Sequence, residues 1–175
     1  DHRHLVMMCG SMGCGPIMSI ARRIGRDLPD DQDLTIVCGT NDRLFDRLSR
    51  RFYGVKNVHI LSYVKDMALL MDSADLYLTK PGGISVTEAA SMRLPMVFID
   101  AVAGCEEYNK DFFLRTGGAA TGKTPAEIAR VSLKLLSDEN TLEKMGDALD
   151  TGVPHDAAAN ILSEMTEAEE EGELA

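Results

Sequence analysis

Residues 79–88 read TKPGGISVTE, a passage from a strand into a helix through a glycine turn. The apolar run 75–79 precedes the turn and a segment with helical periodicity, 84–93, follows it. Two glycines at such a turn allow the backbone to approach a ligand closely. The first N–H groups of the helix favour an anion. The passage therefore predicts an anion-binding turn, with Glu88 about one helical turn beyond it.

The same alternation extends over the rest of the chain. Apolar runs predict strands at 4–9, 34–38, 57–61, 75–79, 95–99 and 118–120. Helical patterns occupy 16–27, 41–52, 65–73, 84–93, 107–115, 125–136, 139–149 and 156–165. Short strands alternating with helices are typical of a parallel sheet covered on both faces. We therefore expect a doubly wound, Rossmann-like α/β domain over residues 1–150. A C-terminal helix and an acidic tail would follow over residues 151–175.

Composition is that of an ordinary globular domain. The 175 residues are 45% hydrophobic and 26% charged, enough for one core. Of the 28 acids, seven lie in residues 151–175, where there is no Lys or Arg, and the other 21 stand against 18 basic residues. This balance does not indicate a nucleic-acid-binding protein. We expect the acidic tail to be solvated and frayed.

The four cysteines, at positions 9, 14, 38 and 105, form no C-x-x-C pair, which argues against a zinc or redox motif. Cys9 and Cys38 end apolar strands and are expected in the core. This usage fits a reducing, cytoplasmic setting. His59 lies inside a predicted strand and is expected to be packed rather than catalytic.

In a parallel α/β sheet, ligands bind beyond the carboxyl ends of the strands. The loop GSMGCG at 10–15 has the spacing G-x-x-G-x-G, not the G-x-G-x-x-G of dinucleotide folds, and lacks the G-K-[ST] of a P-loop. It is either a phosphate-binding loop or a plain turn. Glu88 is either a partner for the helix dipole or an acceptor for vicinal hydroxyls. Glu106, Glu107 and Asn109 either suit a hydroxyl-rich ligand or are ordinary residues of a helix start.

A basic stripe lies on the predicted helix at 41–52. Arg43, Arg47, Arg50 and Arg51 share one face of it, and the apolar residues occupy another. Such a stripe is either a solvated face or a contact for anionic lipid headgroups.

The segment LSYVKDMALLMDSADLYLTKPGGISVTEAASMRLPMVFIDAVAGCEEYN (61–109), followed by FFLRTGGA (112–119), closely resembles one glycosyltransferase family. It is similar to the C-terminal half of the GT-B enzymes that group monogalactosyldiacylglycerol synthases with processive diacylglycerol glucosyltransferases. The resemblance covers residues 4–150. It implies that a Rossmann-like domain for a UDP-sugar is present here. A second such domain, which holds the lipid acceptor and the catalytic base, belongs to a longer protein.

The resemblance also implies roles for individual residues. Tyr63, Val64 and Met67 would form the uracil pocket, and Glu88 would accept hydrogen bonds from the ribose hydroxyls. The diphosphate would be bound by Gly83, Ile84 and Ser85, with Ser11 also facing the phosphates. Cys105 and Glu106 would face the hydroxyls of the sugar. Relatives often have Gln-Glu or Gln-Gln where this chain has Cys105-Glu106. Cysteine is a poor hydrogen-bond partner, so the choice between glucose and galactose stays open.

The implied reaction is inverting transfer of a hexose from a UDP-sugar to a diacylglycerol-type lipid, at the cytoplasmic face of a membrane. It would need no metal and no cofactor, because helix dipole and N–H groups stabilise the departing UDP. The isolated chain is expected to bind UDP weakly and not to turn over. Two alternatives stay open: a protein like the UDP-sugar 2-epimerases, and a nucleotide-sugar-binding module without catalysis. The glycine spacing disfavours an NAD dehydrogenase.

Overall fold

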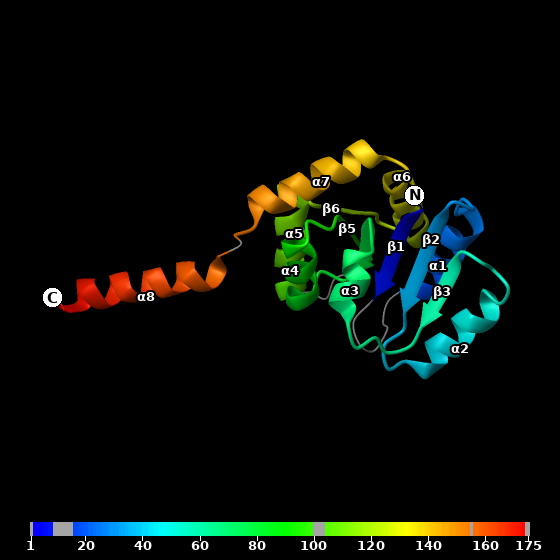
Figure 1. The fold of residues 1–175 in the computed structure, drawn as a ribbon, viewed down its shortest axis with the longest axis horizontal. Coiled ribbons are helices and arrows are strands. Elements are labelled where there is room, and N and C mark those ends of the chain that lie inside the picture. Colours follow the sequence, from blue (N-terminus) through cyan, green and yellow to red (C-terminus); the bar gives the residue numbers. More distant parts are fainter. Residues whose placement is uncertain (1, 9–15, 100–103, 155, 174–175) are drawn as a thin grey trace.

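The computed structural model describes residues 2–8, 16–99, 104–154 and 156–173. Its strands form one parallel sheet in the order β3-β2-β1-β4-β5-β6 (Figure 1). The strands are β1 (Arg3–Met8), β2 (Gln32–Val37), β3 (Val58–Leu61), β4 (Leu76–Thr79), β5 (Met96–Phe98) and β6 (Ala119–Thr121). This is the order of a doubly wound Rossmann-type sheet. The predicted fold class is therefore confirmed.

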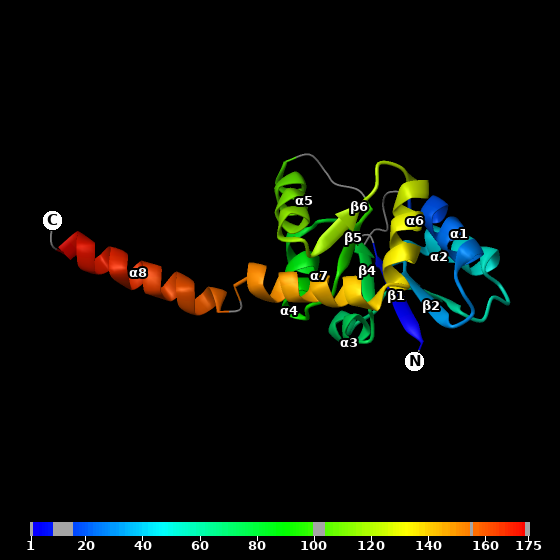
Figure 2. The same cartoon turned by 90° about the horizontal axis from the view of Figure 1, so that it is seen from above.

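Helices cover both faces of the sheet (Figure 2). Side chains of α1 (Ile17–Asp27), α2 (Asp42–Arg51) and α6 (Pro125–Leu136) pack on one face, and those of α3 (Met67–Asp72), α4 (Gly83–Ser91) and α5 (Cys105–Thr116) pack on the other. The helix α7 (Glu139–Gly152) contributes to both clusters, through Leu142 and Leu149.

The strands divide their side chains between these two cores because successive residues of a strand point to opposite faces. On β1, Leu5 and Met7 enter the first cluster and Val6 enters the second, and all three are fully buried. Cys38, directly after β2, is also fully buried, as predicted. Cys9 lies outside the described residues. The continuous burial of these runs, rather than an alternation with polar residues, is what a sheet covered on both faces requires.

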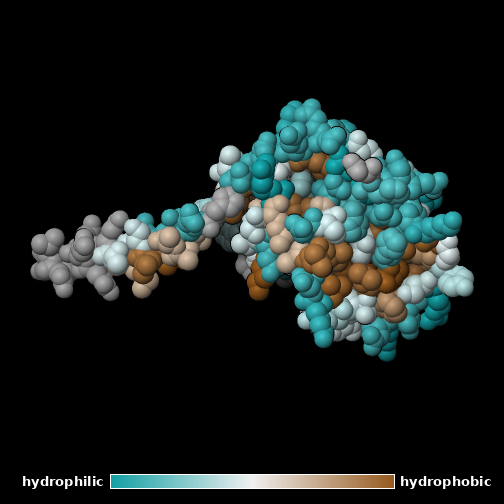
Figure 3. Space-filling model, viewed as in Figure 1, coloured by the Kyte–Doolittle hydropathy of each residue, from teal (hydrophilic) through white to brown (hydrophobic). Residues whose placement is uncertain are grey.

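The helix α8 (Ala157–Glu173) extends away from the body of the molecule (Figures 1 and 2). We predicted that this helix ends near residue 165; that boundary is wrong, because the helix continues to Glu173. Its second half contains five Glu, which favours helix. Hydrophobic side chains on α8 remain exposed (Figure 3), namely Ile161, Leu162 and Met165. Within the described part of the chain, no helix is both long and apolar enough to cross a membrane.

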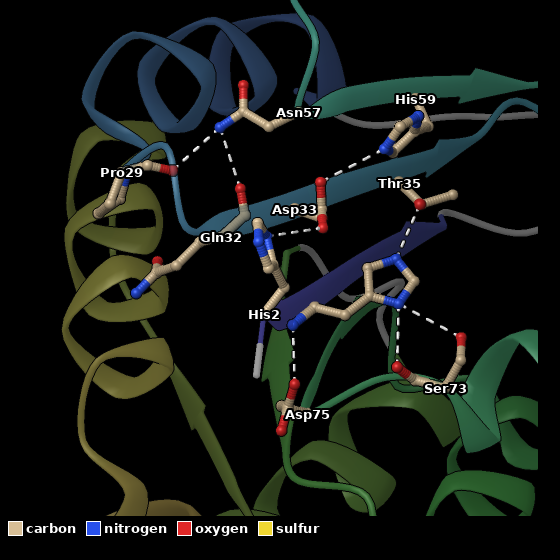
Figure 4. A network of polar contacts seen from close by, with 10 residues as sticks. His2, Pro29, Gln32, Asp33, Thr35, Asn57, His59, Ser73 and Asp75 are labelled. Carbon is tan, nitrogen blue, oxygen red and sulfur yellow. Dashed lines mark hydrogen bonds and ion pairs between the residues drawn. The ribbon is translucent and has the colours of Figure 1, made fainter.

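A network of polar contacts lies at the amino edge of the sheet (Figure 4). The Asp75 carboxylate accepts hydrogen bonds from Arg3 Nη1 (2.6 Å) and from the backbone N–H of His4 (2.7 Å). The His4 ring contacts Thr35 Oγ1 at 2.8 Å and the carbonyl oxygen of Ser73 at 3.0 Å. These contacts join β1 to β2 and to the turn before β4.

The expectation that His59 is packed is wrong. Its side chain is 51% exposed, and its Nε2 lies 3.4 Å from Asp33 Oδ1 (Figure 4). The reason is the strand order: β3 is the edge strand, so every second side chain faces solvent rather than a covering helix.

Candidate functional site

The turn of TKPGGISVTE lies at the topological switch point of the sheet. β1 and β4 are neighbours, with Met8 opposite Thr79. The chain leaves β1 toward α1 on one face and leaves β4 toward α4 on the other. In open α/β sheets, ligands bind in the crevice where the connections diverge in this way. The Lys80–Gly82 turn is therefore placed where this fold binds ligands.

The two glycines of the turn have open space around them. Gly82 is the N-cap of α4 and has an ordinary extended conformation, with φ −76° and ψ 137°. Among the described residues, no heavy atom lies within 4 Å of a Cβ added at Gly82 or Gly83. Contacts with the described part of the chain therefore do not require glycine here. Glycine is common at a helix N-cap, and its missing side chain also allows a ligand to approach the backbone closely.

The first N–H groups of α4 are also accessible at this turn. Gly82 caps this helix without a side-chain hydrogen bond to its first turn, so these N–H groups are available for an anion. A pocket of about 500 Å³ is lined by Gly83, Ile84, Thr87 and Glu88. Ile84 is 79% exposed there, which is unusual for a large apolar side chain. Glu88 thus shares one pocket with the glycine turn.

Side chains of α5 contact the Lys80–Gly82 turn. Lys80 Nζ lies 3.6 Å from Glu106 Oε2, and the two side chains are 14% and 19% exposed. Asn109 Nδ2 donates a hydrogen bond of 2.9 Å to the Pro81 carbonyl oxygen. Sequence reasoning placed Glu106 and Asn109 near the sugar but did not foresee that they hold the turn. Their position after the strand next to β4 was the available signal.

The loop after β3 holds the residues predicted to bind uracil. Tyr63 is 64% exposed and Val64 is half-buried. Met67 begins α3 and packs against the second core cluster. Two strands separate β3 from β4, so the two loops lie about 14 Å apart along the edge of the sheet. Hydrophobic side chains gather between α3 and β3 on the face shown in Figure 3.

Two of the three remaining predicted residues are not fully described by the structure. Ser11 lies outside the described residues. Cys105 is the first residue of α5, but its side chain lies outside them too. Ser85 is half-buried in the first turn of α4. Among the side chains that are described, no group of three or more His, Cys, Asp or Glu is arranged to hold a metal ion.

Comparison with known proteins adds to this geometry. The model of the family Glycosyl transferases group 1 matches residues 21–149. The chain belongs to this family. The glycosyltransferase domain is 30% identical, over 83% of its length, to the processive diacylglycerol beta-glucosyltransferase of Staphylococcus carnosus. It covers 37% of that relative.

Solved structures resemble the glycosyltransferase domain at lower identity. A candidate UDP-N-acetylglucosamine 2-epimerase of Listeria monocytogenes has a TM-score of 0.75 at 19% identity, over 98% of this chain and 46% of that one. MurG of Acinetobacter baumannii has a TM-score of 0.74 at 18% identity, over 95% of this chain and 52% of that one. These likenesses establish the fold, a Rossmann-like domain of the GT-B kind.

Proposed function

We propose that this domain binds the sugar donor of a glycosyltransferase, and that the donor is a UDP-sugar with its diphosphate on the Gly82–Gly83 turn. One observation carries the proposal: a glycine turn without a side-chain cap lies at the switch point of the sheet, and no described heavy atom lies within 4 Å of a Cβ added at either glycine. A diphosphate fits this position because it can accept hydrogen bonds from the first N–H groups of α4.

The remaining parts of the donor then follow the edge of the sheet. Glu88 shares the pocket of the turn and accepts hydrogen bonds from the ribose hydroxyls. Tyr63, Val64 and Met67 hold the uracil, and Ser11 adds a contact to the phosphates. Ile84 and Ser85 complete the diphosphate site with Gly83. The sugar lies toward the start of α5, near Cys105, Glu106 and Asn109.

The reaction we propose for the whole protein is inverting transfer of a hexose to a diacylglycerol-type lipid at the cytoplasmic face of a membrane. The name of the Staphylococcus carnosus relative supports this acceptor. The domain supplies donor binding and stabilises the departing UDP through the helix N-terminus, without metal or cofactor. A second domain supplies the acceptor site and the general base. The 175-residue chain alone binds UDP weakly and does not turn over.

An epimerase-like function is the alternative that the structural likeness raises. Acid–base chemistry on the sugar would need titratable groups beside it, and Glu88 and Glu106 lie near the glycine turn. None of the described histidines lies there: His2 and His4 lie at the amino edge, and His59 lies in β3 with Asp33 as its neighbour. The sequence family favours transfer.

Calorimetric titration with UDP tests the proposal. We expect saturable binding, weakened about ten- to hundredfold by Glu88→Ala, because hydrogen bonds to a carboxylate are lost. Gly82→Ala should weaken binding to a similar degree, because its methyl group occupies space against the diphosphate. Glu143→Ala, an exposed acid on α7, is the matched control for charge. Equal affinities for UDP in all four proteins would contradict the proposed site.

A further inference from the structure

The helices α1 and α2 concentrate positive charge on an otherwise acidic chain. Together they carry seven arginines and three aspartates, although the chain has a net charge of −10. All seven arginines are exposed, while the apolar residues of both helices are buried or partly buried in the first core cluster. We call six of these side chains the arginine surface: Arg22, Arg23 and Arg26 of α1 and Arg47, Arg50 and Arg51 of α2.

Two adjoining pockets shape the arginine surface. One, of about 240 Å³, is lined by Ser19 and by Arg22, Arg23, Arg26 and Arg51. The other, of about 430 Å³, is lined by Met18 and by Arg22, Arg47, Arg50 and Arg51. Arg22 of α1 and Arg51 of α2 line both pockets, so the two helices contribute arginines to one continuous surface.

Carboxylates neutralise little of this charge. Arg26 pairs with its neighbour Asp27 at 2.7 Å, and Arg50 lies 4.0 Å from Asp46. Within the described residues, no acidic side chain lies within ion-pair distance of Arg22, Arg23, Arg47 or Arg51. Like charges held this closely repel each other. An external anion would relieve that repulsion, and guanidinium groups bind phosphate oxygens well.

Exposed apolar and aromatic side chains follow α2 in the chain. Tyr53, two residues after α2, is 91% exposed, and Val55 is 38% exposed. Lys56 follows them and is also exposed. Basic residues next to an exposed tyrosine are typical of a surface that lies in the interface of a bilayer. They are not explained by a soluble phosphate ligand.

The two ends of the molecule carry opposite charge, which would orient it on a charged surface. In both cartoon views, α8 lies at the opposite end of the molecule from α1 and α2 (Figures 1 and 2). The sequence of α8 contains six glutamates and no Lys or Arg. On a negatively charged surface, the arginine end is attracted and the α8 end is repelled.

We propose that the arginine surface, with Tyr53, docks this domain on an anionic lipid bilayer. The choice of a bilayer over another polyanion rests on the proposed function, because a diacylglycerol-type acceptor resides in a membrane. The arginines bind lipid phosphates, and Tyr53 inserts at the level of the headgroups.

Co-sedimentation with lipid vesicles tests the proposal without any sugar donor. Vesicles of phosphatidylcholine alone are compared with vesicles that also contain phosphatidylglycerol. We expect binding only to the anionic vesicles, and its loss as salt rises from about 0.1 M to about 1 M, where the screening length falls from about 10 Å to about 3 Å.

Variants then locate the surface. Arg22→Gln/Arg51→Gln should weaken binding to anionic vesicles about tenfold or more, since each arginine near the membrane contributes about a fivefold factor. Arg115→Gln/Lys144→Gln, with the same change of charge on α5 and α7, should weaken binding far less. Tyr53→Ser should weaken binding several-fold and leave the salt dependence unchanged. All variants change exposed residues, and circular dichroism checks that they fold.

Four results would overturn the proposal. The first two are no binding to anionic vesicles and equal weakening by the control pair. The third is binding to a single-stranded oligonucleotide that exceeds binding to vesicles at equal phosphate concentration. The fourth is displacement of the vesicles by inorganic phosphate at the same concentration, which would indicate a site for a free anion. A failure of the UDP titration alongside arginine-dependent vesicle binding would count against the donor site alone.

Discussion

Lys80 and Glu106 form an ion pair of 3.6 Å between the end of β4 and the first turn of α5, with both side chains largely withdrawn from solvent. The pair joins two connections that leave neighbouring strands of the sheet. It also fixes a cation directly beside the glycine turn. A lysine held in this way is a counter-charge for the proposed diphosphate that needs no ordering when the ligand arrives.

We expect Lys80→Gln to weaken UDP binding by about tenfold, because one charge-assisted contact is lost. It should also lower the free energy of unfolding by about 1–3 kcal/mol, since the ion pair with Glu106 is lost in a partly buried place. Titration calorimetry and urea unfolding measure the two effects. Lys144→Gln on α7 is the control, and an equal loss of affinity there would refute a specific role for Lys80.

The hydrogen bond from Asn109 to the Pro81 carbonyl holds the turn against α5. Asn109→Ala should lower the free energy of unfolding by about 1 kcal/mol. It should weaken UDP binding less than Glu88→Ala does, because its described contact is to the backbone of the turn. Asn140→Ala on α7 gives the baseline for an exposed asparagine. A loss of affinity larger than that of Glu88→Ala would indicate direct contact between Asn109 and the ligand.

Substitution by alanine should change the free energy of unfolding much more at Gly118 than at Gly82. A Cβ at Gly118 would lie 2.1 Å from Leu149 Cδ2, a fully buried side chain. Gly118→Ala should therefore lower the free energy of unfolding by about 1–3 kcal/mol through overpacking. Gly82→Ala, in open space, should change it by less than about 0.5 kcal/mol. Urea unfolding of the two variants decides the matter: a large loss for Gly82→Ala would mean that the chain's own folding requires this glycine.

Asp75 should matter for stability and not for the ligand. Asp75→Ala removes the acceptor of two hydrogen bonds, from Arg3 and from the backbone of His4, and leaves Arg3 paired with Glu139. We expect a loss of about 1–3 kcal/mol in the free energy of unfolding. UDP affinity should be unchanged, because Asp75 lies at the amino edge. A parallel loss of affinity would show that the two edges are coupled.

Burial raises the pKa of the Cys38 thiol from 9.0 to about 11. Its contribution to stability is therefore complete below pH 9.0 and is lost as the pH rises toward about 11, because the unfolded chain ionises first. Native protein and Cys38→Ala should show equal numbers of reactive thiols at neutral pH, and should differ by one only after unfolding in urea. Reaction of Cys38 in the folded chain would contradict this burial.

The hydrophobic periodicity and the turn residues were sufficient to predict the strands, the helices packed on the sheet and the glycine turn. They are local signals, and a run such as 75–79 fits a buried strand better than a helix whatever its neighbours. The Lys80–Glu106 pair was not predictable, since it depends on which strands become neighbours. The exposure of His59 was missed for the same reason: an edge strand and a central strand have similar sequences. The length of α8 was underestimated because its charges were given more weight than its helix propensity.

The polar network of the amino edge and the glycine turn of the carboxyl edge lie at opposite ends of the same strands. Because of this separation, stability and ligand recognition depend on largely different residues. Substitutions that strengthen the amino edge can raise tolerance to heat without disturbing ligand recognition, and loops of the carboxyl edge can be exchanged to alter the ligand without rebuilding the scaffold. A protein built in this way can diversify its chemistry in evolution while keeping one inherited framework.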